Sequence, residues 1–234
     1  MPDRVNTHRG LTTEAVVDAA LAMADLGGID AVSIRRLASE LGVTPMAIYR
    51  HVRDKAQLLD LMADRLLGQI DLPAADGSTW QDALRSVATT LLAIVEAHPA
   101  APLLLARPFA SPAALRVSET MLAVLDRAGF GPTESVRLLQ VLTGMILGPA
   151  LHRVTYSRAW RDQPMDAADE QAGWSAEAAS DFPYLSRLAE QLMDWSAGPE
   201  VDRLTIELWV AGVEALAIRR RQGQDPVPAG PSPG

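Results

Sequence analysis

The chain has 234 residues, of which 48% are hydrophobic, and a formal net charge of −8, an ordinary composition for a globular protein with a core. It contains no cysteine, so it can form no disulfide and offers no thiolate for catalysis or for binding a metal. The acidic total argues weakly against a nucleic-acid partner, but DNA responds to local charge on a surface rather than to the sum.

The N-terminal stretch MPDRVNTHRG lacks the apolar segment of a signal peptide, so we expect a cytoplasmic protein. The most apolar stretch, residues 138–151, is interrupted by glycine and proline and is shorter than the roughly 20 residues that cross a bilayer. We therefore expect a buried helix there and no membrane partner.

The first two helices are marked by their apolar spacing and by their end residues. In residues 11–27 the apolar positions recur at i, i+3, i+4 and i+7, with Thr12 as the expected N-cap and the pair Gly27 and Gly28 as the stop. Ser33 can cap a second helix of the same spacing. Gly42 then offers the left-handed conformation that ends it.

A short third helix and a longer fourth helix follow. Thr44 is the expected N-cap of the third, in which Ile48 and Val52 can face the core. Asp54 is the expected N-cap of the fourth, which should run to about Ile70.

After a break at residues 71–79, the sequence pattern predicts further helices. Helical patterns cover 80–98, 102–107, 112–128, 132–158, 183–196 and 200–221. The acidic, poorly periodic segment 160–181 predicts a mobile loop that holds at most one helical piece. No alternating strand pattern is persuasive, so the predicted fold class is all-α.

Residues 33–51 have the form of a helix-turn-helix, which places its second helix in the major groove of DNA. The alternative is a hairpin of a helical bundle with a charged outer face. Arg35, Arg36 and Lys55 fall in first helical turns, where a cation opposes the helix dipole by roughly 0.3–1 kcal/mol. A phosphate backbone outside the helix N-termini would remove that conflict.

The short third helix also carries side chains that cannot all be buried. Met46 and Tyr49 stand beside Arg50, and exposed side chains of these types suit contacts with thymine methyls, base edges and phosphates. The segment 44–55 is therefore interpreted as a recognition helix followed by a phosphate clamp.

Residues 11–62 resemble the DNA-binding domain of the tetracycline-repressor (TetR) family, through AALAMADLGGIDAVSIRRLASELGV and then IYRHVRDKAQLL. The form YRHVRDK and the C-terminal pattern look most like the tetracycline-repressor branch. The resemblance implies a homodimeric transcriptional repressor that binds a palindromic double-stranded operator and is released by a small-molecule effector.

The resemblance also implies roles for particular residues. Arg35 would read a base, and Ser33, Tyr49 and Lys55 would contact phosphate. Together with the dipole argument, it gives the following DNA-binding set: Ser33, Arg35, Arg36, Thr44, Pro45, Met46, Ala47, Tyr49, Arg50, His51 and Lys55.

On this reading the chain has four parts. They are a flexible arm (1–10), a helix-turn-helix domain with its connecting helix (11–70), a ligand-binding and dimerisation domain (71–221) and a disordered tail (222–234).

The helix at 132–158 is apolar nearly all round, which predicts burial on most sides and a kink at Pro149. Gly144 and Gly148 leave a groove on it for a partner helix or for a ligand. Polar-tipped aromatic residues near an apolar helix suit a small-molecule pocket, although for any one of them the role of an ordinary core or rim residue is favoured. The candidate ligand-binding residues are His98, Met121, Gly144, Met145, Gly148, His152, Tyr156 and Trp174. His98 and His152 lack metal-ligand spacing, so we expect no metal and no cofactor.

The helix at 200–221 has two apolar stripes, which implies two partners: its own core and a second subunit. In the family that it resembles, the helices matching 132–158 and 200–221 pair across a two-fold axis. The candidate dimer residues are Leu204, Leu208, Ala211 and Ala215.

Two other classes of protein compete with a ligand-responsive repressor. One is an enzyme with an incidental helix-turn-helix, but the sequence has no P-loop, nucleophile elbow, dinucleotide fingerprint or HExxH motif. The other is a helical adaptor that binds only protein. Binding to a short palindromic DNA would exclude the adaptor and make the enzyme superfluous.

Overall fold

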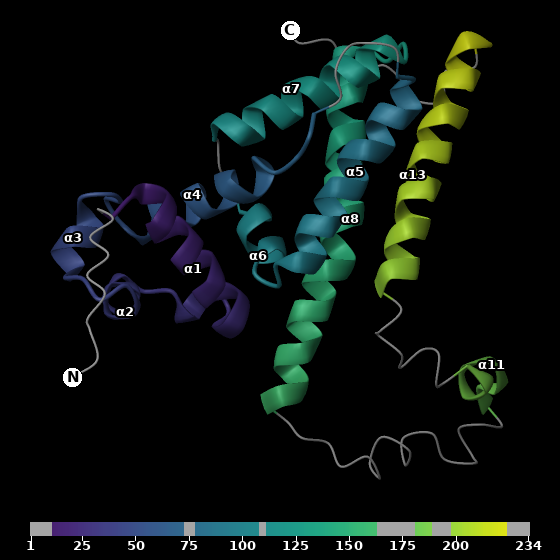
Figure 1. Ribbon diagram of the computed structural model, residues 1–234. Helices are drawn as coiled ribbons and strands as arrows, with labels where there is room; N and C mark the ends of the chain where they lie inside the picture. Colours follow the sequence, from purple (N-terminus) through teal and green to yellow (C-terminus); the bar gives the residue numbers. More distant parts are fainter. Residues whose placement is uncertain (1–10, 73–77, 108–110, 163–180, 189–197, 224–234) are drawn as a thin grey trace, which may run out of the picture. The chain divides into compact units, whose positions relative to one another are not determined.

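The computed structural model describes residues 11–72, 78–107, 111–162, 181–188 and 198–223, and in these ranges it contains helices and no strand (Figure 1). The all-α prediction is therefore confirmed for the described part of the chain. The elements there are α1 (Thr13–Gly27), η1 (Ile29–Ala31), α2 (Ile34–Glu40), α3 (Pro45–Tyr49), α4 (Lys55–Leu67), α5 (Trp80–Ala97), α6 (Ala101–Leu105), α7 (Pro112–Arg127), α8 (Pro132–Asp162), α11 (Pro183–Arg187) and α13 (Gly198–Arg221).

The chain packs as two compact units. The first takes in the described residues up to Ser78 together with Thr90–Val124, and the second takes in Thr79–Thr89 and the described residues from Leu125 onward. The boundary between the units therefore passes through α5 and through α7.

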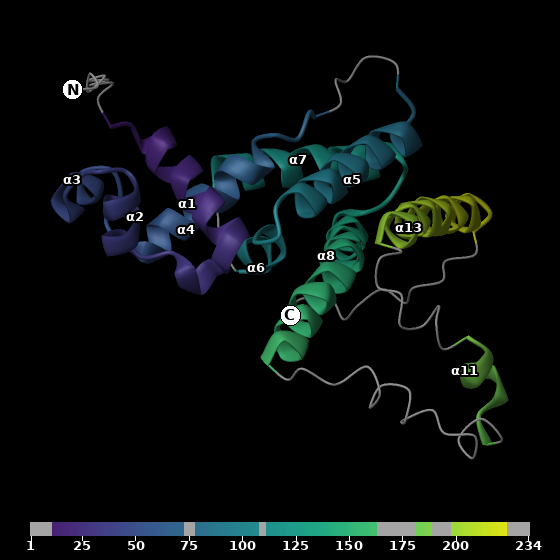
Figure 2. The ribbon, with the colours of Figure 1, turned by 60° about the horizontal axis from the view of Figure 1, so that its bottom comes forward.

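The core of the first unit holds the N-terminal helices together. Helices α1 to α4 bury large apolar side chains against one another, and α4 also packs against α6. Helices α1 to α4 lie next to one another in both views (Figures 1 and 2). The largest fully buried side chains on α1 to α4 and the loops between them are Val16, Val32, Leu37, Ile48, Leu58, Met62 and Leu66.

In the second unit α8 and α13 lie side by side, as both ribbon views show (Figures 1 and 2). Each buries one apolar face, including Leu142 and Ile146 on α8 and Trp209 and Val213 on α13. Polar links add to this packing. Arg220 of α13 pairs with Glu134 of α8, Gln81 of α5 donates to Glu214 at 3.2 Å, and Arg85 of α5 lies 3.5 Å from Glu207.

Several predicted helix boundaries need correction. The fourth helix ends at Leu67 rather than near Ile70, and the helix predicted at 102–107 is Ala101–Leu105. Helix α8 continues through Pro149 to Asp162, beyond the predicted end at 158 and into the predicted loop. Of the helix predicted at 183–196, the described part is Pro183–Arg187, and residues 189–197 lie outside the described ranges.

The arm 1–10, most of the predicted loop at 160–181 and the tail beyond 223 also lie outside the described residues. Within the described ranges, no helix combines the length and the apolar character that crossing a bilayer requires.

Candidate nucleic-acid interface

The helix-turn-helix is built by local capping. The Ser33 hydroxyl accepts from the Arg36 N–H at 3.3 Å and the Thr44 hydroxyl from the Ala47 N–H at 3.3 Å, so α2 and α3 both begin where the sequence predicts. Between them Gly42 has a φ of 65°, the left-handed conformation that glycine adopts without a Cβ clash. The turn between the two helices is thereby fixed by residues within it.

Helix α3 divides its side chains between the core and the solvent. Ile48 and Val52, which lies just after the helix, are buried as predicted. Met46 is 68% exposed and Tyr49 is 49% exposed. Packing in the core of the single chain does not account for an exposed methionine and an exposed tyrosine on one short helix. Side chains of these two types suit contacts with base edges and phosphates.

Two of the cations that were predicted to bind phosphate donate hydrogen bonds to backbone carbonyls of the same helical turn. The Lys55 ammonium donates to the Ile29 carbonyl at 3.2 Å, and the Arg36 guanidinium donates to the Ala31 carbonyl at 3.1 Å. Both carbonyls belong to η1. Lysine has three donors and arginine five, so each cation keeps N–H groups for a phosphate while its position is already restricted.

Glycine residues set the position of η1. Gly28 has a φ of 77°, and a Cβ on Gly27 would lie 2.7 Å from the Cβ of Ala31, closer than two carbon atoms approach. The Gly-Gly pair was interpreted from the sequence as a helix stop, which is confirmed. Its role in placing the turn that holds Lys55 and Arg36 was not predicted.

His51 is half-buried and is tied to the first helix. Its Nδ1 lies 3.2 Å from the Thr13 hydroxyl, so the end of α3 is fixed against the start of α1. Thr12 caps α1 as predicted, accepting from the Ala15 N–H at 3.2 Å. The pKa of the Glu14 carboxyl lies below its usual value because a backbone N–H and the Thr12 hydroxyl hydrogen-bond to it.

The rest of the predicted DNA-binding set lies on the same small domain. Thr44, Pro45 and Arg50 are exposed, as are Arg35 and Arg36, while Ser33 and Ala47 are half-buried. The structure thus places the whole set on α2 and α3, on the residues that flank these two helices, and on the first residue of α4. Contact of these residues with DNA stays a prediction.

The predicted ligand-binding residues that the structure describes belong to two different units. His98 and Met121 belong to the first unit, and Gly144, Met145, Gly148 and His152 to the second. His98 bonds to Asp25, and Met121 is fully buried.

On α8, Gly144, Gly148 and His152 are exposed, and a Cβ added at either glycine would meet nothing within 4 Å. The side chain of Tyr156 and the whole of Trp174 lie outside the described part. A ligand role for this set stays a prediction. Among the described residues, no three or more acidic or histidine side chains gather as metal ligands.

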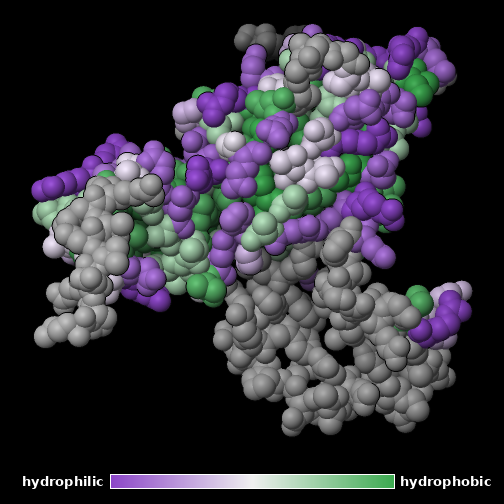
Figure 3. Space-filling view, viewed as in Figure 1, coloured by the Kyte–Doolittle hydropathy of each residue, from purple (hydrophilic) through white to green (hydrophobic). Residues whose placement is uncertain are grey.

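The predicted dimer residues share an exposed stripe on α13. Leu204 is 56% exposed and Leu208 59%, and Ala211 and Ala215 are exposed as well. In the space-filling view, hydrophobic and hydrophilic residues are interspersed on the visible face of this helix (Figure 3). The positions 204, 208, 211 and 215 follow the alternating four- and three-residue spacing that lets one helix seam meet another.

Together, the capped helix-turn-helix, the exposed α3 and the cations around it define a DNA-binding regulator of the helix-turn-helix class. Comparison with known protein families agrees with this geometry. Residues 16–62 match the model of bacterial regulatory proteins of the tetR family, and residues 72–216 match the tetracyclin repressor-like C-terminal domain. The chain belongs to the TetR family of bacterial transcriptional regulators, and it is therefore not an enzyme.

Individual relatives are similar over most of the chain. The HTH-type transcriptional repressor DrrR1 of Streptomyces coeruleorubidus is 31% identical over 90% of this chain and 80% of its own. The tetracycline repressor protein class D of Escherichia coli is 31% identical over 87% of this chain and 89% of its own. The structure of Streptomyces coelicolor ActR in complex with actinorhodin aligns with a TM-score of 0.70 and 26% identity, covering 88% of this chain and 97% of that one.

Proposed function

We propose that this chain is a homodimeric repressor that binds a pseudo-palindromic operator and leaves it when a small-molecule effector binds the C-terminal domain. The observation that carries the DNA-binding part is the division of α3 into a buried and an exposed face. Ile48 anchors the helix in the core, while Met46 and Tyr49 are free to enter a groove.

The cations around α3 support binding to phosphates on both sides of a groove. Arg35 and Arg36 lie in the first turn of α2, and Lys55 is the first residue of α4. Each helix N-terminus adds backbone N–H groups that attract a phosphate. We assign base reading to Arg35 and phosphate contact to Lys55.

The exposed stripe on α13 supports a homodimer. One short recognition helix contacts too few base pairs to select a site in a genome, and a two-fold axis doubles the number read. Leu204 and Leu208 offer apolar surface that the single chain leaves in solvent. The open space beside Gly144 and Gly148 on α8 leaves room for the close approach of a second helix.

The proposal that a small-molecule effector binds this chain is supported by relatives of the same family. Solved structures of ActR contain actinorhodin in one case and (S)-DNPA in another. The tetracycline repressor of class D is similar along most of the chain, including the C-terminal domain. We infer that the C-terminal domain here also binds a small molecule and that the operator-bound and effector-bound states exclude each other.

The test is selection of duplex DNA from a random pool by the full-length protein, followed by titration of the selected duplex. The proposal expects a two-fold symmetric consensus and binding that weakens steeply with salt. A library of small molecules is then screened for release of that duplex. Failure to enrich any DNA sequence would refute the DNA-binding part, and enrichment of an asymmetric single site would refute the dimeric part.

A further inference from the structure

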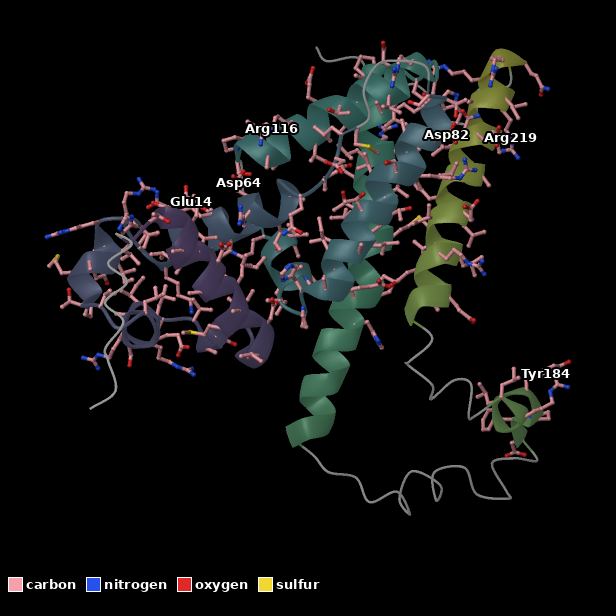
Figure 4. All side chains as sticks on the ribbon, in the orientation of Figure 1. Glu14, Asp64, Asp82, Arg116, Tyr184 and Arg219 are labelled. Carbon is pink, nitrogen blue, oxygen red and sulfur yellow. The ribbon has the colours of Figure 1, made fainter. Side chains whose placement is uncertain are left out.

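The DNA-binding domain carries an apolar groove that is lined by α1 and α2. Its volume is about 670 Å³, and it runs along the later half of α1. Glu14, which Figure 4 labels at the start of α1, lies on the other half of that helix. The apolar side chains that line the groove are Ala19, Ala22, Met23, Leu26, Ala31 and Leu41. The single chain therefore leaves a hollow apolar surface in solvent beside the helix-turn-helix.

Four of these residues form one stripe on α1. Ala19, Ala22, Met23 and Leu26 follow the i, i+3, i+4, i+7 spacing, which places them on one face of the helix. Ala22 and Leu26 are exposed, and the other two are half-buried. The core already buries a different face of α1, so folding of the single chain does not require this stripe to be apolar. We call these four residues the α1 seam.

The groove also carries one cation and one anion, both on α2. Arg36 and Glu40 line it four residues apart, and both are exposed. Arg36 donates to the Ala31 carbonyl at 3.1 Å. Among the described residues, neither Arg36 nor Glu40 takes part in an ion pair. A surface that complements the groove therefore has an acid opposite Arg36 and a base opposite Glu40.

A second copy of the same domain meets this requirement. In an isologous contact, one residue meets a second residue of the partner, and the second meets the first in return. A two-fold axis that crosses α1 and α2 sets each helix antiparallel to its own copy. Arg36 then faces Glu40 of the second copy, Glu40 faces Arg36 of the second copy, and the two α1 seams meet. Leu26, which is 90% exposed, supplies the side chain that enters the opposite groove.

We propose that this groove is the contact surface between the DNA-binding domains of neighbouring dimers on adjacent operators. The α1 seam spans only about two helical turns, and small interfaces are weak on their own. A duplex that holds two dimers side by side raises their effective concentration, as a tether does, so that the contact adds to affinity there. The inference rests on the proposed function, because it requires a dimer that binds an operator.

The first experiment titrates duplexes that carry two copies of the operator selected by the wild-type protein. The distance between the operator centres is varied in single base pairs over one helical turn. The cooperativity factor is the affinity of the second dimer divided by the affinity of a dimer for a single operator. We expect a factor of about 5–150 within a narrow range of spacings. A shift by half a turn moves the second dimer to the other side of the DNA and should return the factor to about one.

Substitutions that lie outside the predicted DNA-binding set test the groove itself. Leu26→Asp places carboxylates in the seam and should bring the factor to about one, with unchanged affinity for a single operator. Glu40→Gln removes two exposed ion pairs and should lower the factor about 2- to 30-fold, at most to one. Leu115→Asp is the matched control, since Leu115 is 63% exposed in the same unit but lies on α7, next to the Arg116 labelled in Figure 4. It should match wild type.

Two results of these titrations would overturn the proposal. One is a factor close to one at every spacing. The other is a wild-type factor in Leu26→Asp, because cooperativity would then be carried by deformation of the DNA rather than by the groove. If Leu26→Asp fails to fold by circular dichroism, Ala22→Glu replaces it, and the same two results apply.

A second experiment uses no DNA and separates this inference from the proposed function. The chain has no cysteine, so Ala22→Cys introduces a single thiol near the middle of the seam, where a two-fold axis brings it close to its own copy. A short bismaleimide should link two chains of this variant increasingly as the protein concentration approaches the millimolar range. Leu115→Cys is the control and should be linked far less. A protein that selects no duplex refutes the proposed function, whereas equal linking of the two variants overturns the groove contact.

Discussion

Leu208→Asp should dissociate the proposed homodimer without unfolding the chain. Leu208 is 59% exposed in the single chain, so most of its side chain is available to a partner. Full burial of a leucine side chain is worth about 1.5–3 kcal/mol, and the exposed share therefore amounts to about 0.9–1.8 kcal/mol. A two-fold axis buries Leu208 twice, which gives about 1.8–3.5 kcal/mol and a dimer weakened roughly 20- to 400-fold.

That range is a lower bound, because the substitution also places two carboxylates in an apolar interface. Sedimentation velocity from nanomolar to micromolar concentration measures the change directly. Leu26→Asp is the matched control, since Leu26 is 90% exposed but lies on α1 in the other unit. If Leu208→Asp dimerises as tightly as the wild type, or if Leu26→Asp dissociates to the same extent as Leu208→Asp, the assignment of the α13 stripe to the interface is refuted.

Three further substitutions test the DNA-binding domain. Lys55→Ala should lower the slope of log affinity against log salt by about 0.9, the loss of one phosphate contact, and an unchanged slope would mean that Lys55 does not touch the backbone. Arg35→Ala should cost about 1–3 kcal/mol and relax preference at one base pair of each half-site, whereas a uniform loss across operator variants would reassign Arg35 to phosphate. Ile48→Ala should lower the free energy of unfolding in urea by about 2–5 kcal/mol, because Ile48 is fully buried, and a near-wild-type midpoint would contradict that burial.

Local sequence rules predicted most of the DNA-binding domain. The N-caps Thr12, Ser33, Thr44 and Asp54 each accept a hydrogen bond where the sequence places them, because a cap depends on residues only two or three positions away. The left-handed conformation of Gly42 follows from the same short-range logic. The helix-turn-helix could therefore be identified before its packing was known.

Long-range polar contacts could not be predicted in the same way. The bond between Nδ1 of His98 and Asp25, 73 positions earlier, was not predicted, and the ligand role of His98 stays a prediction. Lys55 was expected to contact phosphate, and its hydrogen bond to the Ile29 carbonyl was not predicted. Such pairs are set by how helices pack, which neither periodicity nor spacing records.

The most direct test of the proposed function is the stoichiometry and symmetry of the complex with selected DNA. Analytical ultracentrifugation of the full-length chain with its selected duplex should show two chains per duplex. Footprinting should show two equivalent half-sites whose centres are about one helical turn, roughly 10 base pairs, or a multiple of it apart. A single chain on an asymmetric site would contradict the proposal that two α3 helices read the operator together.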